Sequence, residues 1–401
     1  MTERLFEPDV VQCPFPQYRK MQDECPVYKV PDDDLYLVLG YDDCVDVLTS
    51  PDVYSSKAGP GLRQKQGPAA KAVLAQGHRI VRTLLTNDPP SHRRYRRIVN
   101  KAFTPRRIAA LAPEVTSTVQ ELISKLEQNE SVDFVRDFAQ PLPLIVIADF
   151  LGVPRDDLDI FKRWSDDAAE VLGGTLSEQR QIEVNTSLTE LLQYFADRAD
   201  DRRASPSSDF LAALVEAEDG QLTTEEIIAI AYVVLVAGNE TTVNLLSSTL
   251  LMLLEQPALM ARVRADRSLI PSAVEEALRL QSPIQGFPRV ATVDTEIKGV
   301  PVPAGSRVMV MIGAANRDPD HFEHPDDVNL ESAKSSAHIS FGKGIHFCVG
   351  AALSRLEAEI ALNALFDRFG SIEFARADFE PAYADNAILR SLLGLPIVLR
   401  K

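Results

Sequence analysis

Apolar residues recur mainly at helical spacing along the 401-residue chain, so that helices dominate its middle. The spacing predicts helices over 42–49, 105–111, 114–126, 141–151, 156–172, 178–203, 209–216, 272–280 and 351–369. A further helix is predicted to open at Ser91, its N-cap. The segment 225–255 is strongly apolar and follows a cap at Thr224. At ~1.5 Å per residue it predicts a helix of roughly 45 Å, long enough to cross a whole domain.

Strand patterns occur near both ends of the chain. Short runs rich in β-branched and aromatic residues lie at 27–30, 35–39, 289–293, 295–297 and 307–311. The stretch Gly59–Gln76 is rich in Gly, Pro, Gln and Ala and predicts a surface loop with a short helix. No repeat and no low-complexity linker interrupts the chain. The pattern therefore predicts one mainly α domain over 1–401 with small β-sheets.

Composition narrows the possible classes of protein. With 45% hydrophobic and 25% charged residues, the chain is typical of a globular protein and not of a disordered one. Its 42 Lys and Arg against 58 Asp and Glu give a net charge of -16, which argues against binding nucleic acid or anionic lipid. The first residues lack a signal-peptide pattern, and no apolar run reaches the ~18 residues of a membrane span. We expect a cytoplasmic protein with no membrane contact.

One cysteine lies in a glycine-rich loop directly before a helix. Cys348 follows Gly342 and Gly344 and precedes Gly350, where the helix begins. Glycine allows close approach of a ligand, and the helix N-terminus lowers the pKa of a thiol. The thiolate is then a candidate nucleophile or metal ligand; a buried structural cysteine is the plainer alternative. Zinc is disfavoured because no second Cys or His pair lies at zinc-like spacing.

A polar cluster interrupts the long apolar helix. Gly238, Glu240 and Thr241 lie within the stretch Ala237–Thr242. A glycine and an acid–alcohol pair cost stability inside a buried helix, so such a cluster usually marks a functional site or a kink. The plainer alternative is a helix whose hydroxyl groups bond back to the carbonyl four residues earlier.

Basic residues gather between Ser91 and Arg107 without any acid. They are Arg93, Arg94, Arg96, Arg97, Lys101, Arg106 and Arg107. A solvated helix face and a nucleic-acid site are both possible interpretations, and the acidic chain argues against the second. A local basic patch on an acidic protein suits docking of an acidic protein partner through electrostatic steering.

The loop pattern Phe-x-x-Gly-x-His-x-Cys-x-Gly resembles the haem-binding loop of the cytochrome P-450 superfamily. Every position matches, at Phe341, Gly344, His346, Cys348 and Gly350. The resemblance extends over the whole chain, because the other motifs occur in family order. These are the His-x-x-x-Arg helix at 92–96, Ala-Gly-x-Glu-Thr-Thr at 237–242 and Glu-x-x-Arg at 276–279. It implies the family's triangular, mainly α single-domain fold with a long central helix.

The resemblance also implies a role for each matched residue. Cys348 is implied to be the axial thiolate of a b-type haem, and so the metal ligand, in a loop of Phe341, Gly344, His346 and Gly350. The implied contacts of the haem propionates are His92, Arg96, Arg289 and His338. Gly238 would open a groove for dioxygen, Thr241 would hydrogen-bond the oxygen species on the iron, and Glu240 would feed a proton relay. Many members carry a further Arg before the Cys loop; Lys334 is the nearest cation here.

The implied activity is that of a bacterial-type haem-thiolate monooxygenase. It would hydroxylate or epoxidise an apolar small molecule, such as a steroid, terpenoid, fatty acid or polyketide, with O₂. Electrons would come from NAD(P)H through a separate ferredoxin or flavodoxin-type donor docked at Arg93, Arg94, Arg97 and Lys101. We expect a monomer. A peroxygenase driven by H₂O₂ ranks lower because Glu240 and Thr241 are intact; a non-catalytic haem or ligand-binding protein and a cofactor-free interaction protein are further alternatives.

Overall fold

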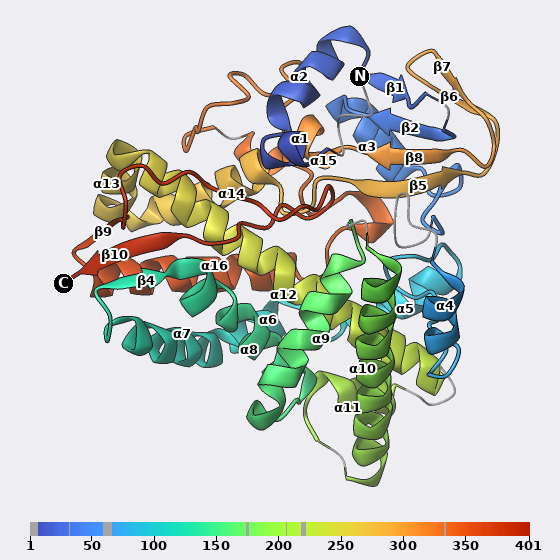
Figure 1. Cartoon of the computed structure of the whole chain (residues 1–401), viewed down its shortest axis with the longest axis horizontal. Helices are drawn as coiled ribbons and strands as arrows, with labels where there is room; N and C mark the ends of the chain where they lie inside the picture. Colours follow the sequence, from blue (N-terminus) through green and yellow to red (C-terminus); the bar gives the residue numbers. More distant parts are fainter. Residues whose placement is uncertain are drawn as a thin grey trace.

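The long apolar segment forms α12 (Thr224–Glu255), which passes through the middle of the protein (Figure 1). The computed structural model describes residues 7–31, 33–58, 66–173, 176–205, 207–217, 222–332 and 334–401. The 32 residues of α12 correspond to about 48 Å of helix. A capping box between Thr223 and Glu226 starts the helix, so the cap is Thr223 and not the predicted Thr224. The helix is long and apolar enough to cross a membrane, but most of it is buried inside the protein.

A helix-rich part lies on one side of α12. Its helices are α5 (Ser91–Asn100), α6 (Pro105–Ala110), α7 (Ala112–Leu126), α8 (Pro141–Leu151), α9 (Leu158–Glu170), α10 (Glu178–Ala204) and α11 (Phe210–Glu216). Figure 1 shows the outline narrowing towards α11 and the lower end of α10. The predicted N-cap of α5 is wrong: Pro90 holds that position, and the Ser91 hydroxyl contacts Asn87 and Asp88 instead of a free N–H of the helix.

A strand-rich part lies on the other side. Its five-stranded sheet has the order β1 (Val27–Lys29), β2 (Leu35–Val38), β8 (Arg307–Val310), β5 (Phe287–Ala291) and β3 (Tyr54–Ser55). Strands β2 and β8 are parallel, whereas the other pairs are antiparallel. The sheet therefore joins the two ends of the chain, as the scattered strand patterns predict. Strands β6 (Thr295–Ile297) and β7 (Val300–Val302) form a hairpin beside it.

Several short elements were absent from the sequence prediction or shifted from it. The N-terminal helices α1 (Pro8–Gln12) and α2 (Phe15–Glu24), the helix α13 (Pro257–Ala265) and α15 (Ile312–Ala315) were not predicted. The remaining helices and strands are α3 (Tyr41–Thr49), α4 (Pro68–Leu74), α14 (Ile270–Gln281), α16 (Ala351–Arg368), β4 (Ser131–Asp133), β9 (Ser371–Phe374) and β10 (Pro396–Arg400). Of the predicted loop 59–76, residues 59–65 lie outside the described part.

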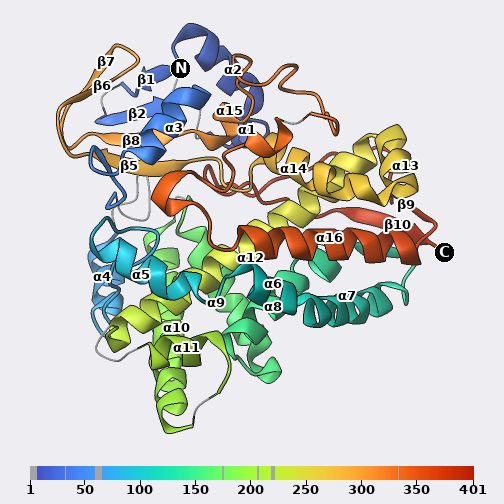
Figure 2. The same cartoon turned by 180° about the vertical axis from the view of Figure 1, so that it is seen from behind.

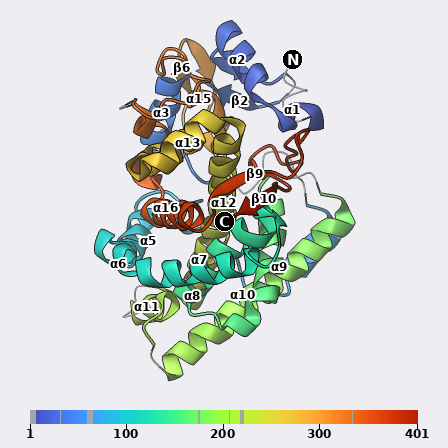
Figure 3. The ribbon, with the colours of Figure 1, turned by 90° about the vertical axis from the view of Figure 1, so that its left-hand side faces the viewer.

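Helix α16 brings the cysteine loop to the centre of the protein. Seen from behind and from the side, α16 lies against α12, with the sheet of β9 and β10 on the opposite flank of α12 (Figures 2 and 3). The core that joins these elements includes Leu246 and Leu250 of α12 and Leu362 and Leu365 of α16. Apolar burial of this kind is worth about 25 cal/mol per Å² and fixes where α16 begins. The cysteine loop is thereby held beside the middle of α12.

Candidate active site

The cysteine loop folds back on itself. The N–H of Cys348 donates to the carbonyl oxygen of Phe341 at 2.8 Å, which closes the loop just before α16. Gly342 and Gly344 have φ of +71° and +67°, a region that favours glycine. A Cβ at Gly344 would lie 3.0 Å from the carbonyl oxygen of Leu48, so α3 also leaves no room for a side chain there. These contacts explain why glycine occupies both positions.

The thiol of Cys348 lies among hydrogen-bond donors at the start of α16. Burial raises its pKa, and this effect outweighs the backbone N–H groups of Gly350 and Ala351 and the charges of Arg96 and Arg355, which all lower the pKa. The expectation of a net lowered pKa is therefore wrong for the protein alone, because burial dominates. A bound metal cation deprotonates a coordinating thiol, and the surrounding donors then stabilise the thiolate.

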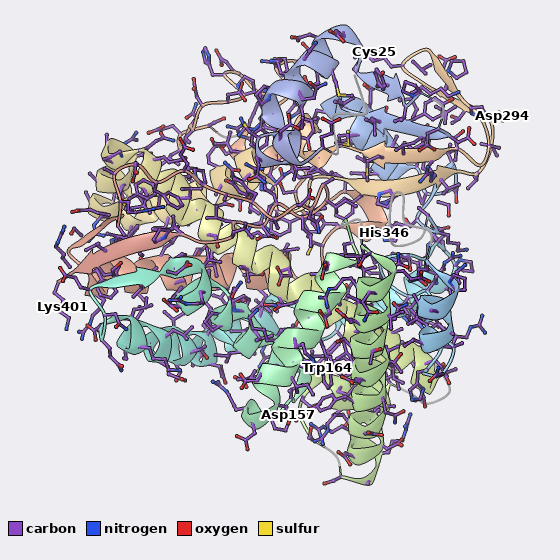
Figure 4. All side chains as sticks on the ribbon, in the orientation of Figure 1. Cys25, Asp157, Trp164, Asp294, His346 and Lys401 are labelled. Atoms are coloured by element: carbon purple, nitrogen blue, oxygen red, sulfur yellow. The ribbon has the colours of Figure 1, made fainter. Side chains whose placement is uncertain are left out.

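Buried cations and imidazoles gather beside the loop, and none of them forms an ion pair with a carboxylate among the described residues. The rings of His92 and His346 lie 4.2 Å apart, and both ring nitrogens of His92 lack a hydrogen-bond partner within the described chain. Arg289 is 6% exposed, and its only hydrogen bond to a described residue goes to the carbonyl of Pro288. Figure 4 shows His346 between the strand-rich part and the helices.

Burial and neighbouring cations keep both imidazoles neutral. Burial and the charge of Arg96 lower the pKa of His92 to about 4. Burial, His92 and Arg289 lower the pKa of His346 to about 3. Burial also lowers the pKa of Arg289 to about 10, although Asp88 opposes this. Uncompensated buried donors are costly, and two carboxylates placed here would satisfy them.

These donors fit the group that a cysteine loop of this kind holds. A haem carries one iron for the thiolate and two propionates for the cationic cluster. His92, His346 and Arg289 are the residues that would hold the propionates, and the guanidinium of Arg96 donates to the carbonyl of Phe347 in the cysteine loop at 2.9 Å. The residues present therefore suit a thiolate-bound haem.

His338 lies on a different ion cluster. Its Nε2 is 3.3 Å from a carboxylate oxygen of Glu275, and its Nδ1 accepts from the N–H of Ser340 at 3.2 Å. Arg355 donates two hydrogen bonds to Glu275, at 2.6 and 2.9 Å. Burial alone would raise the pKa of Glu275, but Arg355 and His338 outweigh it and hold that pKa at about 2. Sequence reasoning missed Glu275 and Arg355, although both flank the recognised motifs.

In the polar cluster of α12, Gly238 has a packing role and Thr241 is a hydrogen-bonding group. A Cβ on Gly238 would lie 3.1 Å from Cδ1 of Ile147, so glycine allows α8 to lie close to α12. The hydroxyl of Thr241 donates to the carbonyl of Ala237 at 2.6 Å, which is the helix back-bond expected of a structural threonine. Its oxygen can still accept a hydrogen bond, so this contact is compatible with a relay role.

Helix α9 presents polar residues to the neighbouring part of α12. Burial raises the pKa of Glu240 to about 7; Asp166 adds to this rise, and Lys162 opposes it. Asn239 donates to Ser165 at 2.8 Å, and both residues are buried. Glu240 can therefore hold or release a proton near neutral pH. The sequence analysis did not identify Ser165 as a site residue, because serines are common on apolar helix faces and the helical spacing does not distinguish this one.

Helices α12 and α16 also meet through hydroxyl groups. The hydroxyls of Thr242 and Ser354 lie 3.1 Å apart. Glu357, one turn further along α16, is buried with one carboxyl oxygen unpartnered by any described residue. Burial raises its pKa well above the usual range, which favours its neutral form. The sequence analysis did not identify these residues.

The Glu-x-x-Arg pair forms a buried network. Arg279 donates to both carboxyl oxygens of Glu276, at 2.8 and 2.9 Å. Its remaining donors reach the carbonyls of Asn316, Pro325 and Asp327. Lys334 instead reaches the carbonyl of His321 and is exposed, so it makes no contact with the pair. Glu276 also accepts a hydrogen bond from the backbone N–H of Asn329 at 2.8 Å, which partly replaces the contact expected from a further Arg.

The predicted basic patch is smaller than expected. Arg93, Arg97 and Lys101 are exposed and form no ion pair with any described residue. Arg94 differs, because its guanidinium pairs with Glu226 at the start of α12 and stacks on Tyr95. The exposed cations that remain are Arg93 and Arg97 of α5 and Lys101, which directly follows the helix.

The geometry defines a class of protein: a helical fold holding one cysteine thiolate and carboxylate-binding cations for a haem. A sequence model of the cytochrome P450 family matches residues 130–391. Cytochrome P450 109 of Bacillus spizizenii is 38% identical over 402 aligned residues, covering 98% of this chain and 92% of the relative.

Solved structures agree with this match. Cytochrome P450 CREJ in complex with (4-ethylphenyl) dihydrogen phosphate superimposes with a TM-score of 0.93 at 34% identity, covering 96% of this chain and 97% of that one. CYP109E1 from Bacillus megaterium in complex with testosterone gives 0.85 at 34% identity, covering 97% and 98%. The chain belongs to the cytochrome P450 family. It is a P450 monooxygenase with the family's fold and its haem b cofactor, as the cysteine-loop motif predicted.

Proposed function

We propose that this P450 hydroxylates or epoxidises an apolar small molecule with electrons from a separate donor protein. The observation that carries the proposal is the juxtaposition of two elements: α16, which begins three residues after Cys348, packs on α12, which carries Glu240 and Thr241. A thiolate ligand and a proton-holding acid–alcohol pair are what activation of O₂ requires. A single catalytic domain over 1–401, monomeric and cytoplasmic, is part of this proposal.

Each site residue has a proposed role. Cys348 is the iron ligand, in the loop of Phe341, Gly344, His346 and Gly350. His92, Arg96, Arg289 and His346 hold the propionates. His338 acts indirectly, because it pairs with Glu275. The bound haem supplies the oxygen chemistry.

Helix α12 supplies the proton path in this proposal. Glu240 holds a proton near neutral pH because burial and Asp166 favour its neutral form. Thr241 is proposed to position that proton: its Oγ1 can accept a hydrogen bond while its own hydrogen is donated to the carbonyl of Ala237. Gly238, which lets α8 lie close to α12, is proposed to open the groove for dioxygen.

An apolar substrate is supported by the residues beside the site and by one relative. Before the polar cluster, α12 carries the apolar residues Val233, Val234 and Ala237, of which Ala237 is exposed. CYP109E1, whose structure was solved with testosterone, resembles this chain over nearly its whole length. Steroids are therefore the first compounds to screen, followed by terpenoids, fatty acids and polyketides.

The absorption spectrum of the reduced, CO-bound holoprotein tests the cofactor assignment. Thiolate ligation by Cys348 predicts the long-wavelength Soret band of the family, and Cys348→His should move it to the position typical of histidine ligation. A variant at the exposed Cys13, Cys13→Ser, should leave the band unchanged. A histidine-type band in the unmodified protein would contradict the proposal.

The proton path is tested by coupling of electron use to product. Thr241→Ala should consume NAD(P)H without a matching yield of product, because protons then reach the oxygen site without control. Activity driven by H₂O₂ alone, at the same rate as with the donor chain and unaffected by Thr241→Ala, would favour the peroxygenase alternative instead.

The electron donor is proposed to dock at the exposed face of α5. Arg93, Arg97 and Lys101 provide three free cations there, and Arg96 of the same helix reaches the cysteine loop. A ferredoxin or flavodoxin-type protein is acidic, so electrostatic steering would bring it to this face of a chain that is otherwise negative.

A further inference from the structure

Helix α1 is attached to a loop near the other end of the chain. The side-chain amide of Gln12 donates to the carbonyl of Tyr383 at 2.8 Å, and its oxygen accepts from the N–H of Tyr383 at 2.8 Å. One side chain thus pairs with both backbone groups of Tyr383, as a neighbouring strand would. Figures 1 and 3 show the C-terminal segment, in red, beside α1. We call residues 383–392 of this segment the C-terminal loop.

A buried arginine of the C-terminal loop makes a second attachment to α1. The guanidinium of Arg390, which is 6% exposed, donates to the carbonyls of Val11 and Gln12 at 3.3 to 3.4 Å. Its Nε donates to Gln281 at 2.9 Å, and its central carbon lies 3.6 Å from the centre of the Tyr383 ring. The last carbonyls of a helix lack partners within it, so this guanidinium satisfies α1 and fixes the loop at the same time.

The C-terminal loop reaches the candidate active site from two sides. Asn244, one turn after the polar cluster of α12, donates to the hydroxyl of Ser391 at 3.1 Å. The N–H of Gln285 donates to the carbonyl of Ile388 at 2.7 Å. Gln285 lies two residues before β5, the strand that carries Arg289 of the candidate propionate site. The loop therefore joins the polar part of α12 to the strand that approaches the cysteine loop.

The tip of the C-terminal loop has a fixed shape and meets the end of α9. The side-chain oxygen of Asn386 accepts from the N–H groups of Ile388 and Leu389 at 3.0 and 2.9 Å. A Cβ on Gly173, three residues after α9, would collide with the Asn386 side chain and lie 2.9 Å from Ile388. A displacement at the base of the loop would therefore move Ile388 with the whole tip and change the space beside α9.

We propose that Gln12 and Arg390 are positioning residues for substrate selection. They hold the C-terminal loop on α1, and the loop limits the space between α9, α12 and β5 in which the substrate binds. This inference rests on the proposed function, since it concerns the same site. Both side chains act through the loop, because their hydrogen bonds to described residues go to α1, α14 and the loop itself. A loop that is held before binding loses little entropy when a ligand contacts it.

The test compares the affinities of imidazole and 4-phenylimidazole, measured by Soret titration of the ferric holoenzyme. Both bind iron through the same kind of ring nitrogen, so the ratio of their affinities reports the surroundings of the phenyl group and not the iron. Gln12→Ala should weaken the binding of 4-phenylimidazole about fivefold and leave imidazole unchanged, because a released loop presents no fixed surface to the phenyl group. Gln120→Ala removes the same side chain from an exposed position of α7 and should leave the ratio unchanged.

Variants of Arg390 test the second attachment. Arg390→Gln should weaken 4-phenylimidazole about fivefold or more, because it leaves carbonyls at the end of α1 without a donor. Arg390→Lys keeps a donor for these carbonyls but loses the planar group that reaches Gln281 and Tyr383, so a loss of only about twofold is expected. Circular dichroism and thermal midpoints identify the folded variants. If Arg390→Gln does not fold, Gln12→Ala decides the test, because Gln12 is only half-buried.

Two outcomes would overturn the proposal. The first is an unchanged affinity ratio in Gln12→Ala. The second is an equal loss for both ligands, which would place the effect at the iron instead of the loop. Failure of the proposed function is distinguishable, because it shows in the CO spectrum of the native protein and in product formation, whereas the affinity ratio of the ferric protein requires neither electrons nor O₂.

Discussion

A carboxylic acid inside an apolar helix makes stability depend on pH. Burial and Asp166 raise the pKa of Glu240 to about 7, from 4.5 for an unperturbed carboxyl group. Because the folded pKa is the higher one, the folded state binds the extra proton, so this stabilisation is full below pH 4.5 and is lost as the pH rises through 7.

Replacing that acid should remove the pH dependence. The glutamine of Glu240→Gln does not titrate. The free energy of unfolding of this variant, relative to that of the native protein, should therefore rise by about 2 kcal/mol between pH 5 and pH 8, a figure discounted for the partial exposure of Glu240. Thermal midpoints of both proteins across this range measure the gain. The exposed Glu216→Gln serves as control and should show a constant difference. A constant difference for Glu240→Gln as well would exclude a raised pKa in the fold.

Arg279 and Lys334 should differ sharply in their importance to stability. Arg279→Lys keeps the charge but loses the planar fork that satisfies Glu276 and three backbone carbonyls, so a loss of about 3 kcal/mol or more is expected. Lys334→Ala should change stability by less than about 0.5 kcal/mol, because its side chain is exposed and outside the network. Denaturant midpoints of the two variants measure this. A large loss with Lys334→Ala would place that lysine in the network after all.

Among the elements, the contact of α8 with α12 depends on a missing side chain. Gly238→Ala gains about 1 kcal/mol of helix propensity, but its Cβ meets Ile147 at 3.1 Å, and overpacking of this kind costs about 1–3 kcal/mol. We expect a lower thermal midpoint for Gly238→Ala alone. Adding Ile147→Val removes the nearest atom, Cδ1, but leaves Cγ1 at 3.2 Å, so it should recover part of the lost thermal midpoint. If the effects of the two substitutions on the thermal midpoint were simply additive, Gly238 would have no packing role against Ile147. The space beside it would then have to serve a ligand.

Periodicity predicted the long elements because burial over many turns leaves a repeated signal. The segment 225–255 and the helix from 351 match α12 and α16 to within one residue at each end. The short helices α1, α2 and α13 were missed because one to three turns carry too few apolar positions to stand out from turns. The cap of α5 was misassigned because the Ser91 hydroxyl accepts from the Asn87 amide and donates to the carbonyl of Asp88 instead of capping the helix.

The motifs predicted which residues approach the site, but not how they pair. His92 and Arg289 carry sequence signals, and the structure brings both of them close to His346. The Asn239–Ser165 bond and the placement of His338 on Glu275 depend on α9 and α14 arriving from distant parts of the chain. Local sequence carries no record of such tertiary contacts. The same holds for Cys348, whose pKa depends on burial that only the assembled fold provides.

At the scale of the whole molecule, charge is distributed unevenly. The net charge is -16, yet Arg93, Arg97 and Lys101 form an exposed basic face on α5. At long range an acidic donor feels the sum of all charges on the protein, which is negative and therefore repulsive. The attraction of the small basic face outweighs this repulsion only when the donor comes close to it. With a Debye length of ~8 Å at physiological salt, steering acts only over that distance. The docking rate should therefore fall steeply as salt increases.

Reversing the charge of this face should slow electron transfer specifically. Arg93→Glu with Arg97→Glu should reduce the bimolecular rate of reduction by an acidic donor roughly tenfold or more at low salt, since steering raises association rates by ~10–10³. Stopped-flow reduction under CO, over a range of ionic strength, measures this rate. Lys20→Glu with Lys29→Glu changes the net charge equally on the strand-rich part and should have a much smaller effect, because its residues lie away from α5. Equal slowing in both variants would mean that net charge alone, and no particular face, governs docking.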